Sequence, residues 1–415
     1  MDVWESVVGQ AQVVERLKKV AQGDSSKIAQ SWLICGASGF GCAKVARAFA
    51  AALQSRGKIA SNRAAENSTT QINTQINTQI NTQINTQINT QINTQINPDK
   101  IASEVLAGTS PDVNILSTDK VTVSIDEVRE IVSMSEQMPS VAPWRIIIIE
   151  DVGRMLERTT NVLLKEIEEP APRTIWILCA ASAADVLPTI RSRSQIVNLV
   201  QPSDQDVQEY VQKCSNVDAK TAESVARIAQ GNVDLAMLYA TSERARSGRE
   251  ELVASVLRIS SAIYAIMLAQ TLIEDAKAQA EDEVQKCVEE EQSEFLRING
   301  IKPTDKIPPK IRSAYNAIGK KDDVKRKVTR VSRDVLNRAI DAICSVYRDV
   351  LVVLNNAQLQ TPLVNQEFKA EIMQLSKKIT AERALKCLDA LAVAKKRLAG
   401  NGNATLVFEA LFCSL

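Results

Sequence analysis

Hydrophobic residues in the first half of the chain follow two alternating patterns. Short apolar runs occur at 31–35 (SWLIC), 113–116 (VNIL), 145–149 (RIIII) and 174–180 (TIWILCA). Between them, apolar residues recur every three or four positions, which is typical of amphipathic helices, whereas short β-branched runs are typical of parallel strands buried on both faces. Strands interleaved with helices predict an α/β fold with a parallel sheet flanked by helices for residues 1 to 200.

The pattern changes after Gln201, where strand-like runs almost disappear. Ala, Leu, Glu, Lys and Arg at helical spacing take over, and the segment 333–354 (RDVLNRAIDAICSVYRDVLVVL) predicts one long packed helix. The rest of the chain is therefore predicted to be all helix.

A low-complexity repeat interrupts the α/β region. The tetrapeptide TQIN occurs seven times in tandem from Thr70 to Asn97. A four-residue period does not keep isoleucine on one helix face, and Gln, Asn and Thr offer little apolar area to bury. We expect an exposed insertion, disordered or loosely structured; an Asn/Gln-rich aggregation or partner-binding tract is the alternative.

Charge is segregated between residues 271 and 333. The segment 274–295 is acidic and the segment 306–330 is basic, with prolines between them. Two solvated helix faces or an antiparallel helical pair with mutual attraction is the favoured interpretation. In the alternative, a basic cluster contacts nucleic-acid phosphates; it comprises Lys320, Lys321, Lys325, Arg326 and Lys327.

Composition excludes several classes of function. The chain has 415 residues, which predicts two or three domains, and its 50 Lys and Arg balance 49 Asp and Glu, so it has no global field for DNA or an anionic membrane. It lacks histidine, which excludes histidine triads and ligands. Eight scattered cysteines without a Cys-x-x-Cys pair, no secretory leader and no long apolar span favour free thiols, a cytoplasmic location and no membrane partner.

Three glycines after the first apolar run outline a phosphate-binding loop. Gly36, Gly39 and Gly41 precede a helical pattern, so backbone N–H groups converge at a helix N-terminus. A working loop continues with a lysine for the outer phosphates and a hydroxyl for magnesium, but this chain has Cys42 and Ala43. Losing two contacts of about 1.5–3 kcal/mol each lowers nucleotide affinity about 100- to 10,000-fold. A plain strand-to-helix turn is the alternative interpretation.

Two further elements suit the same kind of site. The run 145–149 ends in Glu150 and Asp151, a degenerate form of the carboxylate pair that holds magnesium and orients water, here in reversed order. In the alternative interpretation, these two residues simply end a strand or cap the next helix. Farther along, Arg191 and Arg193 flank Ser192 just before an apolar run.

Taken together, these segments resemble the delta-prime subunits of bacterial DNA polymerase III clamp loaders, which belong to the AAA+ family. The similar segments are SWLICGASGFGC, RIIIIEDVGRMLERTTNVLLKEIEEPAPRTIWILCAAS and LPTIRSRSQIV, and the most specific block is TNVLLKEIEEPAPRT at 160–174. The resemblance implies an AAA+ module at 1–200, in which the TQIN insertion occupies 70–97. It also implies a small helical lid at 201–248 and an all-α collar at 249–415 through which subunits assemble into an open ring.

The resemblance also implies a function. Subunits of this type do not hydrolyse ATP, and the arginine of their Ser-Arg-Cys motif reaches the ATP site of an adjacent motor subunit. The matching residue here is Arg193, preceded by Ser192, with Ser194 in place of the cysteine. The expected partners are the gamma or tau motor subunits and the delta subunit, with the sliding clamp indirectly and primer-template DNA through the complex.

Several positions depart from the family pattern. The interval 56–100 contains no cysteine, so a zinc module that many members carry is predicted to be lost, and we expect no metal or cofactor. Polar sensor positions of motor subunits correspond to Ala180 and Ala181, and the lid arginine to Asp234 or Leu235. The alternative is an ATP-hydrolysing AAA+ motor subunit of a clamp loader or related helicase complex. An interaction protein unconnected with replication is a third hypothesis.

Overall fold

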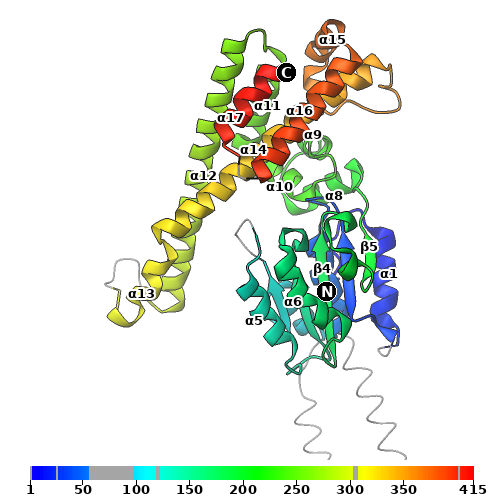
Figure 1. The fold of residues 1–415 in the computed structure, drawn as a ribbon, viewed down its shortest axis with the longest axis vertical. Helices are drawn as coiled ribbons and strands as arrows, with labels where there is room; N and C mark the ends of the chain where they lie inside the picture. The colour runs from blue at the N-terminus through cyan, green and yellow to red at the C-terminus, as the bar shows by residue number, and fades with distance from the viewer. Residues whose placement is uncertain (1, 25–26, 56–97, 118–121, 302–306, 401) are drawn as a thin grey trace, which may run out of the picture. The chain divides into compact units, whose positions relative to one another are not determined.

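The computed structural model describes the chain except for residues 1, 25–26, 56–97, 118–121, 302–306 and 401 (Figure 1). The TQIN repeat therefore lies outside the described residues. The chain divides into two compact units, Met1–Ala240 and Thr241–Leu415.

The first unit is built on a five-stranded sheet. Its strands are β1 (Ser31–Cys35), β2 (Val113–Leu116), β3 (Arg145–Ile149), β4 (Thr174–Ala180) and β5 (Gln195–Asn198). They pair in the order β2-β3-β4-β1-β5, and every pair is parallel. The predicted parallel sheet is confirmed, and β1 lies between β4 and β5.

Helices cover both faces of this sheet. One face packs against α1 (Ala11–Gln22), a helix at 42–55 and α4 (Pro98–Leu106), with Ile34 and Phe49 among the buried residues. The other packs against α5 (Ile125–Ser135) and α6 (Glu157–Glu168), with Leu33 and Leu163 buried. Neighbouring residues of β1 face opposite layers because strand side chains alternate, which explains why the central strands β1, β3 and β4 are buried along their whole length.

Three helices complete the first unit. They are α8 (Asp204–Cys214), α9 (Ala219–Ala229) and α10 (Val233–Thr241). The Ser203 side chain caps α8 in a reciprocal capping box with Asp206, and the Asn232 side chain accepts a hydrogen bond from the Leu235 N–H in the first turn of α10 at 2.9 Å. These caps fix where α8 and α10 begin.

The second unit is helical, as predicted. It contains α11 (Glu243–Leu257), α12 (Ala262–Ile298), α13 (Pro309–Ile318), α14 (Lys321–Leu354), α15 (Lys369–Lys378), α16 (Ala381–Ala399) and α17 (Ala404–Ser414). Its core includes Ile343, Val346, Leu391 and Phe408. The predicted long helix starts at Lys321 instead of residue 333, because valines at 324, 328, 331 and 335 extend the helical spacing.

Helices α12 and α14 run side by side and are linked near α13, as Figure 1 shows. Lys327 Nζ of the basic segment lies 2.9 Å from Glu291 Oε1 of the acidic segment, and the Phe295 and Tyr315 rings pack with centroids 6.0 Å apart. The helical pair predicted from charge segregation is thus present. Phosphate binding by the basic cluster stays a prediction.

Within the described residues, no helix combines the length and the apolar composition that crossing a membrane requires.

Candidate functional site

The glycine loop lies at the carboxyl edge of the sheet. Cys35, the last residue of β1, pairs with Ala180 of β4, and Gly36 N donates a hydrogen bond to the Ala180 carbonyl at 3.0 Å. Glu150 directly follows β3, so it reaches the same edge. Ligands of open parallel sheets bind at this edge, and the structure therefore brings the predicted loop and carboxylates together there.

Two glycines of the loop adopt backbone angles that favour glycine. Gly39 has φ +85° and Gly41 has φ +89°, both in the left-handed region. A Cβ atom on Gly39 would lie 2.0 Å from the side chain of Asn232, and the Val233 N–H donates to the Gly39 carbonyl at 3.0 Å. The loop is therefore seated against the start of α10, with Asn232 filling the space beside it.

Cys42 turns back toward the loop. Its Sγ lies 3.4 Å from the Gly36 carbonyl oxygen and 4.0 Å from that of Ala180. Burial raises the pKa of the Cys42 thiol to about 11. The thiol is therefore neutral at physiological pH and offers no charge to an outer phosphate.

Lys44 is directed to helices α8 and α10. Its Nζ lies 2.7 Å from Asp234 Oδ1 and 5.7 Å from the centroid of the Tyr210 ring. Asp234 is one of the two residues at the expected lid-arginine position. The lysine that follows the loop is thus engaged with the helices that follow the sheet.

Both carboxylates after β3 have guanidinium partners from the same unit. Arg47 Nη2 lies 2.8 Å from Glu150 Oε1, and Arg154 Nε lies 2.6 Å from Asp151 Oδ2. Asp151 has a φ of +62° and occupies the N-cap position of a short 3₁₀ turn, but its side chain makes no capping hydrogen bond. Asp151 therefore stands at a cap position, as the alternative interpretation predicted, but its side chain does not cap the turn.

Arg193 lies at the opposite edge of the sheet. It follows α7 (Pro188–Arg191) and precedes β5, and its Nε is 2.9 Å from Glu168 Oε1 at the end of α6. Its Nη1 donates to the Thr189 carbonyl at 3.1 Å, an acceptor that it shares with the Ser192 hydroxyl.

Ser194 fixes this segment to the sheet. It is buried, and its Oγ lies 2.8 Å from the Oγ of Ser31, the first residue of β1. The glycine loop follows the last residue of β1. Strands rise about 3.3 Å per residue, so β1 separates the two places by roughly 16 Å, a distance that an arginine side chain does not span.

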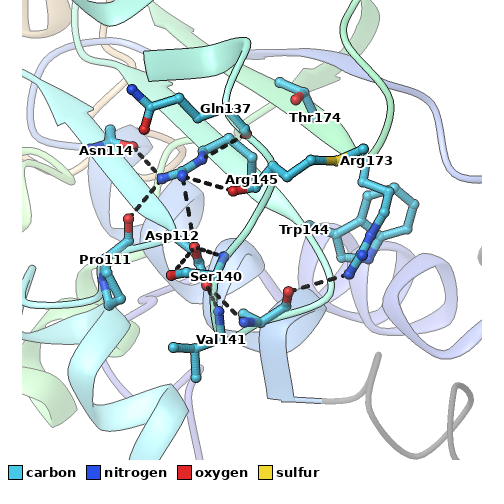
Figure 2. Close-up of polar contacts among 12 residues, drawn as sticks. Pro111, Asp112, Asn114, Gln137, Ser140, Val141, Trp144, Arg145, Arg173 and Thr174 are labelled. Carbon is cyan, nitrogen blue, oxygen red and sulfur yellow. Dashed lines mark hydrogen bonds and ion pairs between the residues drawn. The ribbon is translucent and has the colours of Figure 1, made fainter.

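Figure 2 shows a second polar network, also at the amino edge of the sheet. Asp112 is fully buried and accepts hydrogen bonds from the backbone N–H groups of Ser140, Val141 and Ala142 at 2.6–2.7 Å. Burial acts to raise the pKa of Asp112, but these N–H groups outweigh it and hold the pKa below its ordinary value. Arg145 lies 3.9 Å from Asp112 and donates to the carbonyls of Pro111, Met138 and Gln137. This network supports the fold.

Sequence reasoning gave no role to Arg47, Glu168 or Asn232. Each contacts a residue that was singled out: Glu150, Arg193 and Gly39 respectively. Glu168 falls within the block 160–174, so its presence there was the one available signal. Arg47 and Asn232 offered none.

Among the residues that the structure describes, no group of three or more His, Cys, Asp or Glu side chains is arranged to hold a metal ion. Most of the interval 56–100, where the zinc module was expected to be lost, lies outside them.

The parallel sheet with helices on both faces and the long helical region after it agree with the predicted α/β module followed by an all-α region. Residues 83–203 match the family described as DNA polymerase III, delta subunit. The chain is 34% identical over 113 residues to the DNA polymerase III subunit delta' of Haemophilus influenzae, covering 27% of this chain and 35% of the relative. With the subunit delta' of Pseudomonas aeruginosa it shares 30% over 96 residues, covering 23% and 29%.

The predicted resemblance to delta-prime subunits is thus confirmed over the matched segment, which spans about a third of the length of these relatives. A solved structure of a DNA polymerase III gamma subunit-related protein from Thermotoga maritima aligns with 96% of this chain and 97% of its own, at 15% identity and a TM-score of 0.41.

Proposed function

We propose that the chain is a non-hydrolysing, delta-prime type subunit of a DNA polymerase III clamp loader. In this role it braces the assembly and donates Arg193 to the ATP site of a neighbouring motor subunit. The observation that carries the proposal is the arrangement of the glycine loop. Side chains of the same chain contact the loop and the carboxylate that would otherwise bind ATP and magnesium.

Three contacts support the absence of hydrolysis. The residue in the lysine position is a neutral thiol bonded back to the Gly36 carbonyl. Arg47 pairs with Glu150, one of the two carboxylates after β3 that would bind magnesium or orient water. Asn232 fills the space beside Gly39. Gly36, Gly39 and Gly41 therefore keep the shape of a phosphate site, but the cation and the free carboxylate that hydrolysis requires are missing.

The position of Arg193 supports action on another subunit. The strand β1 separates it from the glycine loop of its own chain, and the side chain is 43% exposed. An arginine supplied from a partner stabilises charge on the transferring phosphoryl group. In GTPases it raises kcat about 10³- to 10⁵-fold. Ser192, which shares the Thr189 carbonyl with Arg193, helps shape the turn that carries it.

The remaining expectations belong to the same proposal. The AAA+ module covers 1–200, the lid 201–248 and the collar 249–415, and the collar is the main assembly surface. Partners are the gamma or tau motor subunits and the delta subunit, with the sliding clamp contacted indirectly and primer-template DNA through the complex. The chain needs no cofactor of its own.

Arg193→Ala tests the proposal in a complex reconstituted with motor and delta subunits. We expect the variant to assemble normally. The single-turnover rate of ATP hydrolysis at the site that it faces should fall by about a thousandfold or more, because a transition-state contact is lost. Arg191→Ala, an exposed arginine two residues away, is the matched control and should leave turnover unchanged. Unchanged turnover in Arg193→Ala would refute the role of this residue.

The purified chain tests the motor-subunit alternative. If magnesium-dependent ATP hydrolysis is measurable and is lost in Glu150→Gln or Asp151→Asn, the chain is a motor subunit and the scaffold proposal is wrong. We expect no such hydrolysis.

A further inference from the structure

The guanidinium of Arg193 is held in place before any partner arrives. Its Nε lies 2.9 Å from Glu168 Oε1, and its Nη1 donates to the Thr189 carbonyl at 3.1 Å. We propose that Glu168 is a positioning residue that orients Arg193 toward the phosphate of a neighbouring subunit. This inference rests on the proposed function of Arg193.

The point of contact decides between positioning and restraint. A guanidinium has five N–H donors, one on Nε and four on the two Nη atoms. Glu168 pairs with Nε, the nitrogen closest to the backbone, and Nη1 donates to the Thr189 carbonyl and the Ser192 hydroxyl, so the donors of Nη2 remain at the outer end for a phosphate. A carboxylate that restrained the arginine would instead compete for that outer end.

The backbone positions of Glu168 and Arg193 are both anchored by buried neighbouring residues. Glu168 is the last residue of α6, which is anchored to the sheet through buried Leu163 and Ile167. Arg193 lies between α7 and the buried hydroxyl pair Ser194 and Ser31. Two fixed backbone positions joined by an ion pair restrict the torsions of the long arginine side chain. Part of the conformational entropy that a free arginine would lose on meeting a phosphate is therefore already lost.

Glu169 offers a matched control. It is the adjacent glutamate, exposed, at the C-cap position of α6, where its backbone N–H donates to the Lys165 carbonyl. Glu168→Gln and Glu169→Gln remove the same charge from neighbouring positions, but only the first removes the ion pair with Arg193.

The experiment uses the reconstituted complex and compares kcat and KM for ATP in the wild type, Glu168→Gln, Glu169→Gln, Arg193→Ala and the double variant Glu168→Gln/Arg193→Ala. We expect Glu168→Gln to lower kcat about two- to fivefold, the range for an exposed ion pair, with KM unchanged. Glu169→Gln should match the wild type. The double variant should match Arg193→Ala, because Glu168 acts only through that arginine.

The outcomes separate positioning by Glu168 from the proposed role of Arg193. If Arg193→Ala slows turnover but Glu168→Gln leaves kcat unchanged or raises it, positioning by Glu168 is wrong and the role of Arg193 stands. A further loss in the double variant would also overturn positioning, since Glu168 would then act independently. If Arg193→Ala itself has no effect, the proposed function fails first.

Discussion

Asp112 illustrates what one buried carboxylate does at the amino edge of the sheet. It lies directly before β2 and binds the backbone of residues 140–142, which lead into β3. Each of these N–H groups would be costly to bury without an acceptor. The carboxylate thereby fixes the path of the chain between α5 and β3.

Asp112→Ala should lower the free energy of unfolding by about 3 kcal/mol, because it leaves three backbone N–H groups without their acceptor and Arg145 without its nearby carboxylate. Urea denaturation of the full chain measures the change in the transition of the first unit. Asp126→Ala, in the exposed first turn of α5, serves as the control and should change it by less than about 1 kcal/mol.

The same residue gives a pH dependence. Because folding lowers the pKa of Asp112, its stabilising contribution is complete above the unfolded value of about 3.9 and is lost as the pH falls through the folded value. The stability difference between the wild type and Asp112→Asn should therefore shrink at acidic pH below about 4. An equal difference at pH 7 and pH 3 would contradict this linkage.

At the residue scale, the sequence identified the residues of the candidate site better than it identified the residues that they contact. Gly39 and Cys42 could be singled out because phosphate loops have a fixed local spacing. The partners of this site are distant in sequence: Glu150 binds Arg47 and Gly39 meets Asn232. Such contacts depend on how the elements pack, and no periodicity within a single chain predicts them.

At the scale of elements, the contact between the glycine loop and α10 is the main feature of the candidate site. Two backbone groups and one side chain form it: the Val233 N–H, the Gly39 carbonyl and Asn232. Lys44 adds an ion pair to Asp234 on the same helix. The loop and the start of α10 therefore form one packed structure.

Gly39→Ala should disturb this contact more than Gly108→Ala does. Both glycines have positive φ, +85° and +72°, so each alanine adds strain of about 1–2 kcal/mol. Only at Gly39 does the new methyl group also overlap Asn232, whereas nothing lies within 4 Å at Gly108. Hydrogen exchange of the Leu235 amide, which Asn232 caps, should accelerate in Gly39→Ala alone. Equal exchange in both variants would show that the overlap is relieved without moving Asn232.

Regular elements were the part best predicted from sequence. The runs 31–35, 113–116, 145–149 and 174–180 are β1, β2, β3 and β4 with the same bounds. For β1, β3 and β4 the reason is that strands buried on both faces have unambiguous apolar runs. The beginning of α14 was placed too late, since its first turns carry many charges. Charge segregation correctly indicated that α12 and α14 pair.

At the scale of the whole molecule, the two units have separate cores and separate chemistry. The first holds the glycine loop and Arg193, and the second is a helical core with its own buried polar network, in which Arg249 Nη2 lies 2.6 Å from Asn365 Oδ1. Asp349 accepts hydrogen bonds from the backbone N–H groups of Val364 and Asn365. The proposed assembly surface in the second unit and the proposed contribution of Arg193 in the first can therefore be altered separately.

Deleting Thr70–Asn97 should barely change assembly or clamp loading, because the repeat offers little apolar area for a partner. Reconstitution of the deletion variant with the other subunits measures both. A severe loss of either would show that the repeat has a binding role of its own.

The pairing of Arg47 with Glu150 has a consequence for how this lineage can change. Restoring lysine and threonine at positions 42 and 43 would return two groups to the loop, yet Glu150 would still be neutralised and Asn232 would still fill its side. A working ATP site would need coordinated replacements on three separate segments: the loop, the Arg47–Glu150 pair and Asn232. Under the proposed function, no single substitution would therefore be enough to give this chain an ATPase site of its own.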